Sequence, residues 1–334
     1  MLTDQVVFVE AAARLHFGVL DLRGSLGRWF GGIGASTHAP TLLVSAQAAD
    51  TLRVEGEAAD RAHDFAERFL ATHAPGRGAR IQVHRMLPAH AGLGSGTQLA
   101  LAIARAIAET YEIDLDAAAL SRAVGRARRS AIGTWTFAGG GLVVEGGRHR
   151  DRDDPGPLLA RIPFPESWRS VIAIPNSTPG ISGRREVEAF AHLPLPPEEE
   201  VAHVAHLVLM ALLPAVVEDD IEAFGAALTE VQQISGRWFA AVQGGTFAAG
   251  ISADLIAQMR QCGALGVGQS SWGPTVYGVV TGDDAALRLA TRIRAWLGDA
   301  GTVYEGPFRT TGARVWRERI QKESGIRNQD SGLL

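Results

Sequence analysis

The sequence predicts an α+β protein built in two parts. The chain has 334 residues, which is too long for one small hydrophobic core and suits two domains. Hydrophobic residues make up 46% and charged residues 20% of the chain, which is typical of a globular protein. Strand-like runs and helix-like periodicity are mixed in both halves rather than strictly alternating, and this favours an α+β fold over a doubly wound sheet.

The first half contains short apolar or branched runs that predict strands, with helices between them. The strands are expected at Val6–Ala11, Thr41–Ala46, Thr51–Glu55, Ala79–Arg85 and Leu142–Glu145, with a glycine-rich stretch from Gly18 to Gly34. Helices are expected near Ala58–Ala74, directly after a glycine-rich loop at Pro88–Gly96, and near Asp116–Arg129.

The loop from His149 to Pro157 is charged, contains proline and glycine, and predicts a domain boundary. We expect one domain over residues 1–160, a second over 161–325, and a disordered tail at 326–334. Strands are expected at Ser170–Ile174, Pro274–Thr281 and Gly301–Glu305, helices at Glu198–Leu213, Asp219–Val242, Ser252–Gln261 and Asp284–Leu297, and another glycine- and serine-rich segment at Gly266–Gly273.

Composition narrows the class of protein. The formal net charge is -4, which argues against a nucleic-acid partner. Lys322 is the only lysine, so anion binding within the folded body depends on arginine and backbone N–H groups. Cys262 is the only cysteine, which excludes an intramolecular disulfide. No signal peptide and no run of about 18 apolar residues is evident, so we expect a cytosolic enzyme without a membrane partner.

The loop Gly92–Gly96 is the strongest local signal for chemistry. Glycines let a backbone approach a ligand closely, and the helix start that follows offers unpaired N–H groups and a positive dipole end. Together with the Ser95 and Thr97 hydroxyls, these groups predict a cradle for phosphate or pyrophosphate. The alternative is a plain turn in which Ser95 only caps the helix.

Pro88–Gly96 resembles the phosphate loop of the GHMP kinases. Further segments in matching order resemble one branch of that superfamily, the β-ribofuranosylaminobenzene 5'-phosphate synthases. These segments are Arg14–Asp21, Gly31–Gly34, Gly94–Leu99, Arg129–Gly133 with Phe137 and Gly140–Gly141, and Gly268–Thr275. The resemblance implies a two-domain GHMP-kinase-like fold with the active-site cleft between the domains.

The resemblance also implies an activity. Members of that family join 4-aminobenzoate, or its 4-hydroxy analogue, to phosphoribosyl pyrophosphate, and release CO2 and pyrophosphate in the synthesis of methanopterin-type cofactors. We therefore expect these small molecules as partners, Mg2+ as cofactor, no ATP, no organic cofactor, and a homodimer.

The charged residues of the first segment are the candidates for catalysis. We predict Asp21, Arg28 and His16 as catalytic, and Asp21 as a Mg2+ ligand, directly or through water. Arg28 could hold a carboxylate or phosphate in a bidentate fork. The alternatives are a structural Asp21–Arg28 ion pair and a structural histidine.

The remaining candidates are expected to bind substrate or phosphate. They are Arg14, Gly92, Gly94, Ser95, Gly96, Thr97, Gln269, Ser270, Ser271, Trp272, Arg184 and Glu186. Trp272 could stack on the aromatic acid, or lie in the core. Two other functions stay open at this point: an ATP-dependent small-molecule kinase, disfavoured by the missing lysine and the Gly96-Thr-Gln98 continuation, and a non-catalytic ligand sensor.

Overall fold

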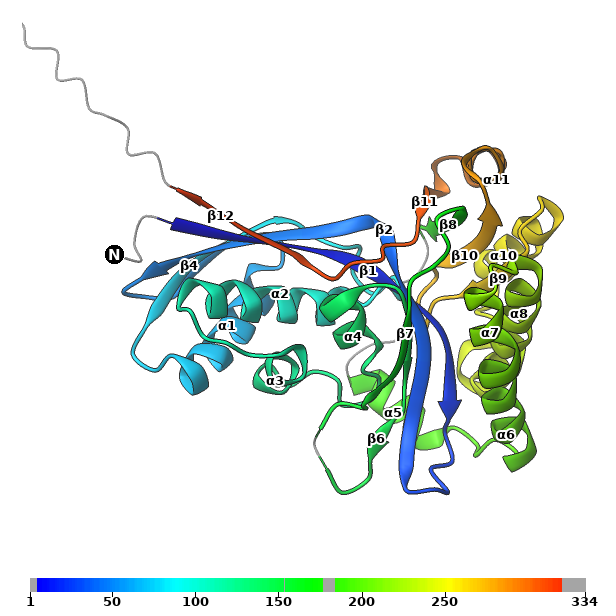
Figure 1. Ribbon diagram of the computed structural model, residues 1–334, viewed down its shortest axis with the longest axis horizontal. Coiled ribbons are helices and arrows are strands. Elements are labelled where there is room, and N and C mark those ends of the chain that lie inside the picture. Colours follow the sequence, from blue (N-terminus) through cyan, green and yellow to red (C-terminus); the bar gives the residue numbers. More distant parts are fainter. Residues whose placement is uncertain (1–4, 153, 177–183, 320–334) are drawn as a thin grey trace, which may run out of the picture.

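A computed structural model of the chain describes residues 5–152, 154–176 and 184–319, and the side chains of all of these but 184–187. It contains two β-sheets with helices packed against them (Figure 1). The strands are β1 (Gln5–Asp21), β2 (Arg28–Ala49), β3 (Arg53–Gly56), β4 (Gly78–Arg85), β5 (Leu142–Glu145), β6 (Arg148–His149), β7 (Leu158–Ile162), β8 (Trp168–Pro175), β9 (Gly266–Gln269), β10 (Val276–Thr281), β11 (Gly301–Pro307) and β12 (Arg314–Arg319).

The helices lie mainly between the strands of each half. They are α1 (Ala59–His73), α2 (Ser95–Thr110), α3 (Ala117–Ala123), α4 (Ile132–Gly139), α5 (Arg184–His192), α6 (Glu198–Leu207), the π-turn η1 (Val208–Leu212), α7 (Leu213–Val217), α8 (Ile221–Trp238), α9 (Ala240–Gln243), α10 (Ile251–Gln261), α11 (Asp283–Leu297) and the short turn η2 (Gly298–Ala300).

The larger sheet is organised by the long antiparallel strands β1 and β2. Its main path runs β12-β1-β2-β4-β3, and β5 and β6 also pair with β2. The glycine-rich stretch from Gly18 to Gly34 lies at the ends of β1 and β2 and in the turn that joins them. Gly34 is needed there because a Cβ at this position would be 2.5 Å from Ile132 Cγ2 of α4. The small residues therefore let α4 pack closely on the sheet.

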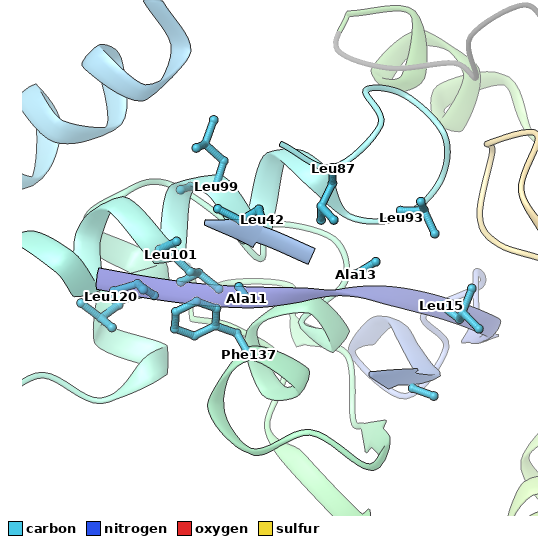
Figure 2. Close-up of a cluster of buried hydrophobic side chains, with 14 of the residues drawn as sticks. Ala11, Ala13, Leu15, Leu42, Leu87, Leu93, Leu99, Leu101, Leu120 and Phe137 are labelled. Carbon is cyan, nitrogen blue, oxygen red and sulfur yellow. The ribbon is translucent and has the colours of Figure 1, made fainter. Parts of the chain in front are cut away.

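Helix α2 forms the centre of the N-terminal core (Figure 2). Leu99 and Leu101 are fully buried and belong to the same core as the β1 residues Ala13 and Leu15, which are also fully buried. Each fully buried leucine stabilises the fold by about 1.5–3 kcal/mol through removal of apolar surface from water. The position of the α2 N-terminus is thereby fixed by the core.

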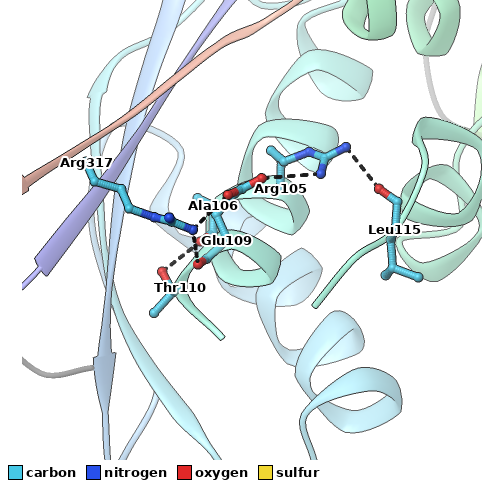
Figure 3. Close-up of polar contacts among 6 residues, drawn as sticks. All are labelled: Arg105, Ala106, Glu109, Thr110, Leu115 and Arg317. Carbon is cyan, nitrogen blue, oxygen red and sulfur yellow. Dashed lines mark hydrogen bonds and ion pairs between the residues drawn. The ribbon is translucent and has the colours of Figure 1, made fainter. Parts of the chain in front are cut away.

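The C-terminal end of α2 is held by the last described strand. Arg317 of β12 donates from Nη2 to the backbone oxygen and to Oε2 of Glu109, each at 3.0 Å (Figure 3). Arg105 donates from Nη2 to the Leu115 carbonyl at 3.0 Å. Strand β12 itself pairs with β1, so a segment from the end of the chain completes the N-terminal sheet.

The smaller sheet has the order β11-β8-β10-β9. Its buried residues pack against α10 and α11 in a separate core that includes Val171, Leu255, Met259 and Ile293. The domain division predicted after residue 160 falls within β7, which pairs with β5 of the larger sheet.

Several elements differ from the sequence-based expectations. The helix expected at Asp116–Arg129 ends at Ala123, and residues 124–131 form a loop before α4. Helix α4, the short helix α5, and the strands β7 and β12 were not predicted. Helix α10 begins at Ile251 after Gly250 at its N-cap, one residue before the expected start at Ser252.

The helical run Glu198–Val217 is more apolar than expected, since no run of about 18 apolar residues was predicted. Among the described helices, it alone is long and apolar enough to cross a membrane, with a mean hydropathy of 1.9 and 28% of the window buried. Three glutamates open the run, a π-turn interrupts it, and it packs against α8.

Candidate functional site

The two glycine-rich loops meet backbone to backbone. Gly92 has a φ of 83°, and a Cβ added there would lie 2.0 Å from the Ser270 carbonyl oxygen. A Cβ on Gly273 would lie 2.1 Å from the carbonyl carbon and oxygen of Ala91. Any side chain at either position would separate the loops. Glycine is therefore required by contact between the loops as well as by the turn itself.

Ser270 ties together the three segments singled out in the sequence. Its Oγ accepts a hydrogen bond from the His16 backbone N–H at 2.9 Å and donates to the Gly92 carbonyl at 2.7 Å. The Arg14 guanidinium also donates to the Gly92 carbonyl, at 2.6 Å. Ser270 is fully buried. Its hydroxyl holds the loops in place and is not among the groups that line the neighbouring cavity.

A cavity of about 570 Å³ opens at this junction, between the N-terminus of α2, the loop 125–130 and helix α8. His16, one of the predicted catalytic residues, lines it, as do most of the predicted binding residues: Arg14, Gly92, Gly94, Ser95, Gly96, Thr97, Gln269, Ser271 and Trp272. The sequence reasoning thus identified much of this wall. Arg184 and Glu186 begin α5, but their side chains lie outside the described residues.

One end of the cavity is strongly cationic. The described lining contains five arginines and no aspartate, glutamate or lysine. The arginines are Arg14, Arg61, Arg126, Arg128 and Arg129. Arg14 lies close to Gly94, and Arg61 and Arg126 lie close to Gly96, at the N-terminus of α2, where the backbone adds partial positive charge. A site of this kind favours a ligand with several negative charges.

The other end is aromatic. The Trp272 ring lies edge-on to Phe190 and Phe239, with ring centroids 5.4 and 4.8 Å apart. Phe30 packs against Phe190 at 5.6 Å, and the Arg129 guanidinium lies 5.2 Å from the Phe190 ring centroid. Phe30, Phe190, Phe239 and Trp272 all line the cavity. An aromatic ring could pack in this wall while an anionic group faces the arginines.

Backbone strain is concentrated around the cavity. Among the described residues, seven residues other than glycine have a positive φ, and four of them line the cavity: Phe30, His90, Ala127 and Ser271. A positive φ is especially unfavourable for a bulky residue such as Phe30, at 72°. Strained conformations of this kind cluster at functional sites, where the surrounding structure holds them in place.

His16 lies in the cavity wall as a neutral imidazole. Burial, together with the nearby Arg14 guanidinium, lowers the pKa of His16 to about 3. The side chain can therefore donate from one ring nitrogen and accept at the other near neutral pH. It does not carry the proton that an imidazolium acid would need.

Asp21 is the last residue of β1 and Arg28 the first residue of β2, and neither is among the residues that line the cavity. Asp21 Oδ1 accepts the backbone N–H groups of Arg23 and Gly24 at 2.6 and 3.0 Å. Arg28 donates from Nη1 to the Gly147 carbonyl at 3.1 Å. No ion pair joins Asp21 to Arg28 in the part of the chain that the structure describes. Their predicted catalytic roles stay predictions.

The predicted role of Asp21 as a Mg2+ ligand stays a prediction, and the described cavity lining supplies no carboxylate of its own. Carboxylate oxygens are the protein ligands that Mg2+ prefers, and none lines the described cavity. No group of three His, Cys, Asp or Glu side chains that could hold a metal occurs among the described residues. The donor set thus suits anions rather than a resident cation.

The sequence did not predict the lining arginines outside the recognised segments, Arg61, Arg126 and Arg128, or the aromatic residues Phe30, Phe190 and Phe239. The arginine-rich run Gly125–Arg129 was noticeable, in a chain whose only lysine is near its end, but no function was assigned to it. Arg61 gave no signal, because it lies on the amphipathic helix α1 far from any glycine-rich loop.

Comparison with known proteins identifies the relatives. The family models described as GHMP kinases N terminal domain and GHMP kinases C terminal match residues 59–140 and 212–299. A beta-ribofuranosylphenol 5'-phosphate synthase from Methanothermobacter thermautotrophicus is 36% identical, over 90% of this chain and 96% of its own. One of the same name from Archaeoglobus fulgidus is also 36% identical, over 85% of this chain and 91% of its own.

Solved structures show the same fold at lower identity. A homoserine kinase from Cytophaga hutchinsonii has a TM-score of 0.68 at 17% identity, covering 95% of this chain and 98% of that one. A mevalonate diphosphate decarboxylase from Staphylococcus aureus also has a TM-score of 0.68, at 14% identity, covering 93% and 98%. These likenesses confirm the predicted GHMP-kinase-like architecture, and at this identity they carry no activity over.

Proposed function

Since this chain belongs to the family of beta-ribofuranosylphenol 5'-phosphate synthases, which has the GHMP kinase fold, we propose that it transfers a phosphoribosyl group to an aromatic acid with loss of CO2. It is an enzyme of the glycosyltransferase kind. The acid is 4-hydroxybenzoate or 4-aminobenzoate, and the donor is phosphoribosyl pyrophosphate.

One observation carries the proposal beyond the family: a single cavity has a cationic end and an aromatic end. The arginines and the first turn of α2 suit the phosphates of the donor, and the wall around Trp272 suits a benzoate ring. Arg129 lies where these two ends meet, since it lines the cavity and contacts the Phe190 ring.

The reaction then needs few protein groups. The bond between the sugar C1 and the pyrophosphate oxygen breaks, the ring carbon that bears the carboxylate bonds to C1, and the carboxyl carbon leaves as CO2. No aromatic proton has to be abstracted. The principal requirement is stabilisation of negative charge on the departing pyrophosphate by donors already in position. The arginines and the α2 N-terminus meet that requirement without a general base.

We propose that Mg2+ enters as part of the substrate, bound to the oxygens of phosphoribosyl pyrophosphate. This follows from the lack of carboxylates in the described lining. The homodimer that the family resemblance implies and the cytosolic location expected from the sequence are separate proposals. Light scattering on the purified protein would test the first.

The decisive experiment is release of labelled CO2 from carboxyl-labelled 4-hydroxybenzoate and 4-aminobenzoate, each with phosphoribosyl pyrophosphate and Mg2+ and without ATP. We expect release that requires both substrates, and the ratio of kcat/KM for the two acids identifies the preferred one. Consumption of ATP with a small alcohol and no CO2 release would instead favour a kinase. Ligand binding without turnover would favour a sensor.

A further inference from the structure

Arg61 is brought into the cavity from helix α1, outside every segment that the sequence singled out. Its position is defined by Gly96, in the first turn of α2. A Cβ added to Gly96 would lie 2.8 Å from Arg61 Nη2 and also 2.8 Å from Arg126 Nη2. Two guanidinium groups therefore reach the same point on α2, and they do so only because residue 96 has no side chain.

An anion bound at this point would be attracted by both guanidinium groups. Two like charges lie close together beside the positive end of a helix. Arg126 donates to Thr97 Oγ1 at 3.3 Å. Within the described residues Arg61 makes no hydrogen bond or ion pair, and no carboxylate lines the cavity.

The geometry suits a phosphoryl group better than a carboxylate. Each guanidinium can donate two parallel hydrogen bonds, and the backbone N–H groups of Ser95 and Gly96 stand at the start of α2 before the first intrahelical hydrogen bonds, which begin at Thr97. A carboxylate has only two oxygens to share among these donors. A terminal phosphoryl group has three, which can face the two arginines and the helix at once.

We propose that Arg61 and Arg126 form a two-arginine clamp that holds one phosphoryl group of the substrate against the first turn of α2. The proposal rests on the proposed function for the identity of the substrate. The group held is either the diphosphate or the 5'-phosphate of phosphoribosyl pyrophosphate. In this clamp Arg61 is a substrate-binding residue, and its positive charge pairs with the phosphoryl group of the ligand.

The test compares Arg61→Gln and Arg61→Lys with a control, Arg288→Gln, at an exposed position of α11 away from the cavity. Calorimetric titration with pyrophosphate and with ribose 5-phosphate gives dissociation constants that do not require turnover. Losing one charge-assisted contact is expected to weaken binding of one of these two ligands by about 10- to 100-fold. Lysine is expected to restore little, because it cannot form the fork.

The ligand whose affinity falls identifies the group that the clamp holds. The KM for phosphoribosyl pyrophosphate should rise in parallel, while the KM for the aromatic acid and the properties of Arg288→Gln stay unchanged. If Arg61→Gln binds both ligands as wild type does, the clamp does not exist. If the variant fails to fold, Arg126→Gln provides the same comparison. Absence of CO2 release by the wild-type enzyme would count against the proposed function alone, since the titrations still test the clamp.

Discussion

Replacing Gly96 with alanine is expected to leave the fold intact and to weaken phosphate binding. Gly96 lies in the first turn of α2 and does not have the positive φ that Gly92 and Gly94 have. Alanine is therefore compatible with the backbone, and in a helix it is favoured over glycine by up to about 1 kcal/mol. Thermal stability should stay equal to that of the wild type or rise slightly.

The alanine methyl group at position 96 would displace the guanidinium ends of Arg61 and Arg126. The new methyl group would lie 2.8 Å from Nη2 of both Arg61 and Arg126, closer than carbon and nitrogen can approach. Both atoms are at the ends of flexible side chains, so they can move away at little expense to folding. Displacing one charge-assisted hydrogen bond costs about 1.5–3 kcal/mol of binding, or roughly 10- to 100-fold in affinity.

Gly94→Ala is the matched comparison. Gly94 has a φ of 75°, so alanine there adds about 1 kcal/mol or more of backbone strain. Its Cβ would also lie 2.9 Å from Arg14 Cγ, which is close to the backbone and cannot move aside as easily as a guanidinium tip. This variant should lose both stability and binding.

The assay combines thermal unfolding with calorimetric titration of pyrophosphate for the wild type and both variants. We expect Gly96→Ala to keep its thermal stability and lose affinity for pyrophosphate, and Gly94→Ala to lose both. The reasoning would be refuted if Gly96→Ala bound pyrophosphate as tightly as the wild type, or if it were as unstable as Gly94→Ala.

Three other predictions concern Glu145, Asp21 and Trp272. Burial raises the pKa of the Glu145 carboxyl to about 7, so between about pH 4.5 and 7 the folded protein keeps a proton that the unfolded chain has lost. The free energy of unfolding should therefore fall as the pH rises through this window, by on the order of 3 kcal/mol. Denaturant titrations of Glu145→Gln should not show this decrease. An equal decrease in the wild type and the variant would contradict the raised pKa of Glu145. Asp21→Asn retains an oxygen for the Arg23 and Gly24 N–H groups, so it should keep near wild-type turnover, whereas a loss of about 10²-fold in CO2 release would support the catalytic role predicted from the sequence. Trp272→Leu should raise the KM for the aromatic acid by about threefold to tenfold and leave the KM for phosphoribosyl pyrophosphate unchanged. Trp296→Leu on α11 is the control. Equal effects of the two variants would place Trp272 outside the acid site.

The sequence predicted the fold well where local chemistry decides structure. The glycine-rich loop and the apolar periodicity after it are properties of adjacent residues, so Gly92–Gly96 and the helix α2 were both expected. Strand β12 is mostly exposed and polar, and its strand form depends on the edge of β1, more than 300 residues earlier in the chain. No local pattern could reveal such a partner.

The candidate site divides in the same way. Residues inside the recognised segments, such as Arg14 and Trp272, do line the cavity. Ser270 belongs to one of those segments yet lies behind the cavity wall. Its hydroxyl accepts a hydrogen bond from the His16 backbone in β1 and donates one to the Gly92 carbonyl, so it joins these segments and does not face the cavity. Arg61 and Phe190 come from helices whose sequences resemble ordinary surface or packing patterns, and only tertiary structure brings them to the cavity.

The return of β12 to the first sheet has a consequence for synthesis of the protein. Gln5–Glu10 of β1 pair with Arg314–Arg319, so that flank of β1 has no partner until almost the whole chain has left the ribosome. An unpaired strand edge is a template for pairing with other chains. Emerging N-terminal domains on the same messenger RNA would therefore carry an exposed edge during translation, and production of the protein should depend on chaperones that bind nascent chains. A product terminated before residue 314 would keep that edge open permanently and should aggregate.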